Sequence, residues 1–528
     1  MSATALTSYD LIPYPSYSFP QTHPDRLAVI ATLLGLKPQS VENCRVLELG
    51  CAAGSNLIPM AEEFPQSTFV GIDLSQSQID EGRKAIAELG LSNIELRHQS
   101  LLDFKPGSEM FDYILCHGVY SWVPPDVQEQ ILAICQHSLQ PNGVAYVSYN
   151  TLPGWHMRGM IRDMMLYHGR RFDDPHQQIA QARSLLDFLV SSVDTQQNPY
   201  GKFLHSELEG IRRSPDAYLF HDHLEEHNSP IYFHQFIERA AAHQLRYLAE
   251  VELSTMDLQN FPQQVGQVLQ RVCNDQIQLE QYMDFLRNRT FRQTLLCHAR
   301  CKPNYRLDPA TLATFFVGSP LQSVSPRPDL HSSAREDFRR PSGSFAYSTY
   351  PIVKAALVVL GEAWPRFLPF DDLCSQARAK LHGHAIPNEA IRGVDKQQVG
   401  QALLKFYTIA GDLVEFRLRP LRMTTQPGPK PLARPLARWQ ARSGRSATNL
   451  RHESVTLDDF GRQVLLRLDG QRSRTDMVRE LAGLVLDGQL NVHQDGKRIT
   501  EPRQIEQAIV QFLDLQIDQF ASRALLMA

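Results

Sequence analysis

The sequence predicts an α/β fold built on a doubly wound parallel sheet, followed by smaller domains that mix helices with strands. Two observations lead to this prediction. Between residues 45 and 150, short apolar runs alternate with longer amphipathic stretches, which is the pattern of strands and crossover helices. The first apolar run also ends in a glycine turn that opens a helix, and such turns bind ligands at the edge of parallel sheets.

The glycine turn follows the strand predicted over residues 45–49, and it contains Gly50 and Gly54. Glycine allows the backbone to approach a ligand closely, and the helix that follows presents unpaired N–H groups at its start. The second predicted strand, residues 68–73, ends in Asp73 about 20 residues beyond the turn, where such folds hold ribose hydroxyls. Together these features predict a site for a nucleotide-like cofactor.

The spacing Glu48-x-Gly50-x-Ala52-x-Gly54 resembles the motif of class I S-adenosylmethionine-dependent methyltransferases, with Ala52 in place of the middle glycine. The NAD spacing G-x-G-x-x-G is absent. The resemblance implies a Rossmann-like sheet and S-adenosylmethionine as cofactor. It carries the cofactor-binding role to Glu48, Gly50, Cys51, Gly54, Asp73, Leu74, Ser100, Leu101 and His117. Ser100 stands where the family usually has an aspartate, so we expect backbone at Leu101 to meet the adenine.

The remaining pieces of the sheet are interrupted. Strands are predicted at residues 93–98, 111–116 and 143–150, with helices at 76–89 and 126–139. Residues 154–230 then indicate a helical insertion, which lies over the ligand crevice if it follows the carboxyl end of a strand. The last helix is predicted at 232–243 and the last strands at 245–253 and 290–298. We therefore expect a methyltransferase domain over residues 1–303 that folds and binds cofactor without the rest of the chain.

The C-terminal half predicts two winged-helix-like domains, over residues 304–420 and 446–528. Helices are expected at residues 350–382, 395–406, 457–468, 475–486 and 501–520, and a strand at 413–418. Two stretches rich in Pro, Ser and Arg, residues 318–344 and 420–446, punctuate this half. The segment Arg417–Arg451 holds nine basic residues and no acidic one. It is either a contact for nucleic acid or an acidic protein, or a solvated basic linker.

The N-terminal arm, residues 9–20, is rich in Tyr and Pro and cannot form a regular helix. It is followed by a helix over residues 22–35, with Pro24 in the first turn. An aromatic arm in front of a nucleotide-binding fold either covers the cofactor or packs on the sheet.

Several longer segments resemble bacterial methyltransferases that carry a methyltransferase regulatory domain. These segments are Tyr14–Tyr17, Thr22–Leu27, His117–Val123 and Val147–Trp155, and the opening of the regulatory domain is similar to Tyr218–Glu226 and Tyr247–Glu250. The resemblance implies a regulatory-domain-like segment over residues 218–303. Some members of this family are dimeric protein-lysine methyltransferases that act on bacterial outer-membrane proteins. The resemblance therefore implies that the substrate is a lysine of a protein and that the enzyme is a homodimer.

Methyl transfer from a sulfonium needs donor and nucleophile held in line in a dry site, and it needs no metal. The candidate catalytic residues at the rim of the sheet are His117, Tyr120, Trp122, Tyr149 and Asn150. Their aromatic faces either hold a sulfonium or a lysine stem, or pack in the core. Two alternatives stay open: a small-molecule N- or O-methyltransferase, and a non-catalytic cofactor-sensing or DNA-binding regulator.

The composition bears on the cellular compartment and on whether the protein binds nucleic acid, a membrane or a metal. The net charge is −4, which does not favour nucleic-acid binding, and the eight Cys show no paired framework. Because the cysteines are unpaired and the N-terminus has no secretory apolar region, we expect a cytoplasmic protein. No apolar run is long enough to span a membrane. Two sets of residues match zinc-binding patterns. They are the H-x-x-E-H match at His223–His227, and Cys297, Cys301, His382 and His384. Pro230 would end the helix that the first needs, and the second lacks a second close cysteine pair, so no metal is predicted.

Overall fold

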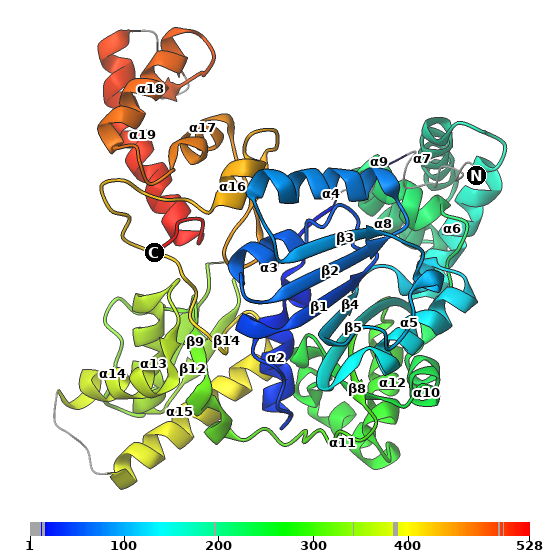
Figure 1. The fold of residues 1–528 in the computed structure, drawn as a ribbon. Coiled ribbons are helices and arrows are strands. Elements are labelled where there is room, and N and C mark those ends of the chain that lie inside the picture. The colour runs from blue at the N-terminus through cyan, green and yellow to red at the C-terminus, as the bar shows by residue number, and fades with distance from the viewer. Residues whose placement is uncertain are drawn as a thin grey trace.

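The computed structural model describes residues 12, 16–194, 197–341, 343–383, 389–494, 497–499 and 501–528. Within them, the central sheet has eight strands in the order β3-β2-β1-β4-β5-β8-β7, with β6 paired to β5 (Figure 1). The strands are β1 (Arg45–Leu49), β2 (Thr68–Asp73), β3 (Ile94–His98), β4 (Phe111–Cys116), β5 (Leu139–Leu152), β6 (Ile231–Tyr232), β7 (Leu245–Glu250) and β8 (Phe291–His298). Only β8 runs antiparallel to its neighbours. The predicted fold class is confirmed.

Helices cover both faces of this sheet. They are α2 (Pro24–Leu33), α3 (Leu57–Glu63), α4 (Gln76–Leu89), α5 (Pro125–His137) and α10 (Phe233–Ala242). Apolar residues of α2, α3 and α4 share a buried cluster with Val46 and Tyr146. Those of α5 and α10 share another with Leu47 and Val147. Because neighbouring residues of one strand point to opposite faces, the two clusters are the two sides of a doubly wound sheet.

The segment after β5 is helical, as the sequence predicts. It contains α6 (Trp155–Gly169), α7 (Pro175–Ser192), α8 (Pro199–Arg213), α9 (Asp216–Leu219) and a π-helix, η5 (Phe220–Leu224). These helices have a hydrophobic core of their own, which also includes Ile12 of the N-terminal arm. The insertion and the start of the chain are therefore packed together.

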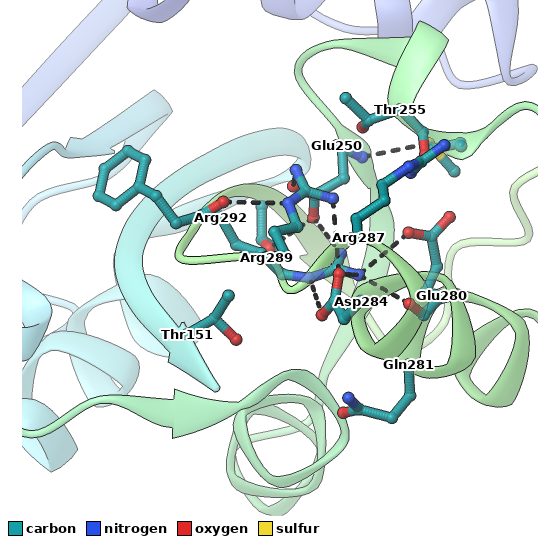
Figure 2. A network of polar contacts seen from close by, with 12 residues as sticks. Thr151, Glu250, Thr255, Glu280, Gln281, Asp284, Arg287, Arg289 and Arg292 are labelled. Atoms are coloured by element: carbon teal, nitrogen blue, oxygen red, sulfur yellow. Dashed lines mark hydrogen bonds and ion pairs between the residues drawn. The ribbon is translucent and has the colours of Figure 1, made fainter. Parts of the chain in front are cut away.

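Two helices that the sequence analysis does not predict, α11 (Gln263–Val272) and α12 (Gln276–Arg287), lie between β7 and β8. A buried ion network fastens α12 to the sheet (Figure 2). Arg292 of β8 pairs with Glu250 of β7 at 2.8 Å, and with Asp284 and Glu280 of α12 at 2.8 and 3.1 Å. Its guanidinium lies 3.7 Å from the ring centre of Phe233. All four charged groups are buried, and Arg289 adds a second cation, 2.9 Å from Glu250 and 3.8 Å from Asp284.

A second structural unit begins after β8. Strand β9 (Phe316–Gly318) lies between β13 (Leu368–Pro369) and β14 (Glu415–Arg417), beside α13 (Pro351–Ala363), α14 (Phe370–His382) and α15 (Glu389–Ile409). The helical run predicted over residues 350–382 is interrupted near Pro365, which lacks the N–H that a helix interior requires. The stretch over residues 318–344 contributes to folded structure, because β10 (Gln322–Ser323), β11 (Glu336–Arg339) and β12 (Phe345–Ser348) form an antiparallel sheet.

The last unit has a separate hydrophobic core. It is built from α16 (Pro435–Gln440), α17 (Asp459–Arg467), α18 (Arg474–Leu486) and α19 (Pro502–Ser522), with the short pairs β15 (Ser446–Thr448)–β16 (Ser454–Thr456) and β17 (His493–Gln494)–β18 (Lys497–Arg498). In Figure 1 this unit rises in orange and red beside α3 and α4. The preceding unit does not have its own core, because Phe315, Leu360 and Phe416 belong to the cluster that also contains Val46 and Tyr146 of the central sheet.

The basic segment, residues 417–451, contains arginines that are buried. Neither a contact for nucleic acid or an acidic protein nor a solvated linker accounts for them. Arg419 and Arg434 are buried and pair with Glu63 and Glu62 at the end of α3, and Arg434 also donates to the carbonyl of Pro59. Arginines of this segment therefore join the C-terminal half to the helix that follows the glycine turn.

Candidate active site

The glycine turn between β1 and α3 has a backbone shape that other residues adopt only with strain. Gly50, Ala52 and Gly54 have positive φ values of 75°, 49° and 73°. A Cβ added at Gly50 would lie 2.4 Å from Cγ2 of Val119, and one at Gly54 would lie 3.0 Å from Cδ1 of Leu96. Val119 and Leu96 therefore pack closely against the turn, at the end of the strand where a ligand is expected.

Asp73 joins the end of β2 to this turn. One carboxylate oxygen accepts the N–H of Ala52 at 2.8 Å, and the other accepts the N–H of Ser75 at 2.9 Å. The next residue, Leu74, is 56% exposed. Ser100 caps the short helix that begins at Leu101, just beyond β3. The structure therefore brings these predicted residues to one edge of the sheet, beside the glycine turn.

Glu48 and Cys51 lie beneath the turn. Burial raises the pKa of Glu48 to about 8. Its Oε1 accepts a hydrogen bond from Nδ2 of Asn56 at 2.7 Å, whereas its Oε2 is buried with no hydrogen-bond partner among the described residues. Cys51 is buried beside Gly71, where an added Cβ would lie 2.7 Å from the Cys51 sulfur. The unpaired carboxyl oxygen is therefore a polar group that a ligand can satisfy.

The described part of the N-terminal arm lies across the turn. The backbone N–H of Phe19 donates to Oδ1 of Asn56 at 3.0 Å, and Oγ of Ser16 accepts the N–H of Ser55 at 3.3 Å. The Phe19 ring lies 4.2 Å from the ring of His117. This placement favours the first interpretation of the arm, in which it covers the cofactor.

His117, at the end of β4, forms one wall of the same site. Its Nδ1 is 2.8 Å from the hydroxyl of Tyr146 and 3.3 Å from that of Ser148. The Phe291 ring meets it edge-on at 6.3 Å. Burial lowers the pKa of His117 to about 4, so its ring is neutral near pH 7. The site thus has aromatic walls and an uncharged imidazole.

Tyr120 and Tyr149 occupy a different environment. Both are buried, and they pack on Phe236 of α10 at ring distances of 5.2 and 4.1 Å. The hydroxyl of Tyr149 is 3.1 Å from that of Thr294. The pleat of β5 turns Tyr149 away from Ser148 and His117. The geometry therefore gives core contacts to these two predicted catalytic residues and does not bring them to His117.

Trp122 and Asn150 lie where β5 meets the segment before β6. Trp122 packs edge-on against Trp155 at 6.1 Å. The Asn150 backbone N–H donates to Oγ of Ser121 at 2.8 Å, and its side-chain amide lies 3.5 Å from Oδ1 of Asn228. The Asn228 Nδ2 is buried with no hydrogen-bond partner among the described residues.

The zinc patterns do not form a site in the part of the chain that the structure describes. There, no group of three or more His, Cys, Asp or Glu side chains is arranged to hold a metal ion. His223 belongs to η5, which ends at Leu224, so no helix continues to His227. His384 lies outside the described residues.

Three family models match the chain: "Methyltransferase domain" over residues 46–143, "Predicted methyltransferase regulatory domain" over 215–298, and "PKMT, C-terminal winged helix domain" over 429–525. The solved structure of PKMT2 from Rickettsia typhi in complex with AdoHcy is 32% identical, with a TM-score of 0.87, and the match covers 98% of this chain and 100% of that one. An uncharacterized protein of Rickettsia prowazekii is 38% identical over 532 residues, covering 98% of this chain and 93% of its own.

The chain belongs to the PKMT family of methyltransferases. It is an S-adenosylmethionine-dependent enzyme, and the predicted cofactor is confirmed. The geometry of this PKMT homologue fits that cofactor, because the positive-φ turn, Asp73 and the unpaired oxygen of Glu48 lie together.

Sequence reasoning missed four residues of this PKMT site. Phe19 and Asn56 flank motifs that the sequence analysis recognised, so their position along the chain pointed toward them. Asn228 and His452, which contacts Asn56, carried no such signal, because only folding brings them to the sheet edge.

Proposed function

We propose that this enzyme N-methylates lysine side chains of a protein substrate. The observation that carries the proposal is the extent of the match to PKMT2, whose name abbreviates protein-lysine methyltransferase: it includes the insertion, the regulatory region and the C-terminal half. A demethylmenaquinone methyltransferase of Listeria monocytogenes, which acts on a small molecule, is 31% identical over 114 residues and matches only 21% of this chain. The parts absent from that match support a larger substrate.

The residues at the sheet edge divide between cofactor and substrate. Glu48, Gly50, Cys51, Gly54, Asp73, Leu74, Ser100 and Leu101 form the cofactor cradle, with His117 on its substrate side. When bound, S-adenosylmethionine would supply an electrophilic methyl group, to which the substrate amine bonds as the carbon–sulfur bond breaks and S-adenosylhomocysteine leaves. The Phe19 ring, which packs against His117, gives the sulfonium an aromatic face, and such a face stabilises a cation beside it.

The substrate lysine must be neutral to act as a nucleophile. A site walled by Phe19, Phe291 and a neutral His117 favours the uncharged amine, because desolvation lowers the pKa of a lysine. His117 is a weak base, so we assign it to shaping the site and leave the product's proton to solvent. We assign the unpaired Nδ2 of Asn228 to orient a carbonyl of the substrate backbone, with Asn150 as the neighbour that contacts Asn228.

A homodimer and a cytoplasmic location belong to the same proposal. Among the described residues, no helix has the length and hydrophobicity required to cross a bilayer.

The regulator alternative receives less support, because Arg419 and Arg434, two of the arginines in the basic segment, form ion pairs with Glu63 and Glu62.

The proposal is tested by incubating the enzyme with S-adenosylmethionine carrying a labelled methyl group and with outer-membrane or cytosolic protein fractions. We expect label in protein, on lysine Nζ by peptide mass spectrometry, and much less label with the Asp73→Ala variant at the same cofactor concentration. Label found only in low-molecular-mass acceptors would support the small-molecule alternative. DNA retention in a gel shift without any methyl transfer would support the regulator.

A further inference from the structure

We propose that His452, from the C-terminal half, is a positioning residue for the cofactor turn. It reaches the turn through Asn56, the residue just before α3. Nε2 of His452 lies 2.8 Å from Oδ1 of Asn56, and Nδ2 of Asn56 lies 2.7 Å from Oε1 of Glu48. The exposed fractions of His452, Asn56 and Glu48 are 1%, 3% and 3%. A buried chain of hydrogen bonds therefore runs from the last structural unit to the motif carboxyl group.

The direction of each hydrogen bond follows from one backbone donor. The N–H of Phe19 donates to Oδ1 of Asn56, so this atom must be the amide oxygen. His452 must then donate from Nε2, and the Asn56 amino group must face Glu48. Burial lowers the pKa of His452, so the ring carries a single proton, and its Nδ1 has no hydrogen-bond partner among the described residues. His452 thus helps to hold the Asn56 amide in the orientation that binds Glu48.

Hydrogen bonds fix the backbone around His452 in the conformation that makes this contact. His452 has a φ of 65°, in the left-handed region, within a turn where Oδ1 of Asn449 accepts the N–H groups of Arg451 and Glu453. The carbonyl of Asn449 accepts a hydrogen bond from Arg434, which also binds Glu62 of α3. The turn that presents His452 is therefore tied to the helix that follows the cofactor turn.

The consequence is that the C-terminal half forms part of the cofactor site. Residues 1–303, which are predicted from the sequence to bind cofactor alone, lack His452 and Arg434. Without His452, the Asn56 amide loses a buried donor, and Glu48 loses one of the groups that order its partner, the others being the N–H of Phe19 and the hydroxyl of Thr22. The inference depends on the assignment of residues 48–56 as the cofactor cradle, and it is independent of the substrate.

The experiment compares two variants of the full chain, His452→Leu and His452→Gln. Both place an unfavourable residue at the same positive φ, so they share the backbone strain. Only Gln retains an N–H donor that reaches Asn56. Binding of S-adenosylhomocysteine is measured by calorimetry without substrate. We expect His452→Leu to weaken binding roughly three- to tenfold, as the loss of a neutral hydrogen bond does, and His452→Gln to stay within about twofold of wild type.

Two controls separate positioning from structural support. Trp439→Phe removes another interdomain hydrogen bond, from Trp439 to Glu88 at 2.7 Å, and should leave binding unchanged. In an Asn56→Ala background, His452→Leu should cause no further loss. Wild-type binding by His452→Leu, or equal losses for Leu and Gln, would overturn the inference. Normal binding by Asp73→Ala would instead overturn the cofactor assignment itself.

Discussion

Asp73 combines two tasks in one side chain, because its carboxylate holds Ala52 of the turn and is the acid expected to bind the cofactor ribose. Hydrogen bonds to a charged group are worth about 1.5–3 kcal/mol each. Asp73→Ala should therefore weaken S-adenosylmethionine binding roughly ten- to a thousandfold, measured by calorimetry. Unchanged affinity in a folded variant would refute the assignment.

Glu48 gives the enzyme a pH-dependent stability. Its folded-state pKa is raised from 4.5 to about 8, so the stabilisation is complete below pH 4.5 and is lost as pH rises toward 8. Across this window Glu48 should lower the free energy of unfolding of the cofactor-free protein by about 1.4 kcal/mol per pH unit, whereas buried histidines with a lowered pKa, such as His117, act in the opposite direction below pH 6.5. Urea titrations at several pH values should therefore give Glu48→Gln a slope that is more positive than that of the wild type. An identical slope would contradict the raised pKa.

Gly50 is needed for its backbone conformation. Gly50→Val should abolish cofactor binding, because it combines a positive φ with a clash against Val119. Gly35, which lies outside the site, is unsuitable as a control because its own φ is 84°. Gly210→Ala in α8 is better matched, since nothing lies within 4 Å of the added Cβ. Equal binding by Gly50→Val and Gly210→Ala would show that the turn is not the cradle.

At the scale of elements, periodicity predicted most of the central sheet, including β8, which returns after a long interruption. It did not predict which face of β5 carries the site. Ser148 and Tyr149 are adjacent in sequence, yet one lies beside His117 and the other packs on Phe236. That distinction depends on helices that cover one face, and these come from distant parts of the chain. The strands of residues 318–344 were missed because polar and proline-rich residues mask their short pairing.

The network around Arg292 is the element-scale contact most sensitive to substitution. Arg292→Met should lower the free energy of unfolding by about 3–5 kcal/mol, because it leaves Glu250, Glu280 and Asp284 buried without this partner. Arg212→Ala, which removes an exposed ion pair with Asp187, should leave it nearly unchanged. Chemical denaturation measures both. A loss for Arg292→Met no larger than that for Arg212→Ala would contradict the buried network.

At the scale of the molecule, the two C-terminal units should respond differently to deletion. Residues 304–420 share a hydrophobic cluster with the sheet, so a chain ending at residue 304 would expose α2 and should aggregate. The last unit has its own core, so a chain ending at residue 428 should fold but bind S-adenosylhomocysteine at least threefold more weakly. Light scattering and calorimetry distinguish these outcomes. Normal affinity in either truncated chain would show that the site is complete without His452.

The hydrogen bond between Asn56 and His452 joins residues 396 positions apart. Ribosomes add about 5–20 residues each second, so about 20–80 s of synthesis separate the two partners. During that interval the nascent protein has made its glycine turn and its first strands, but it still lacks the histidine that orders Asn56. The growing chain therefore reaches its full affinity for the cofactor only when translation is almost finished.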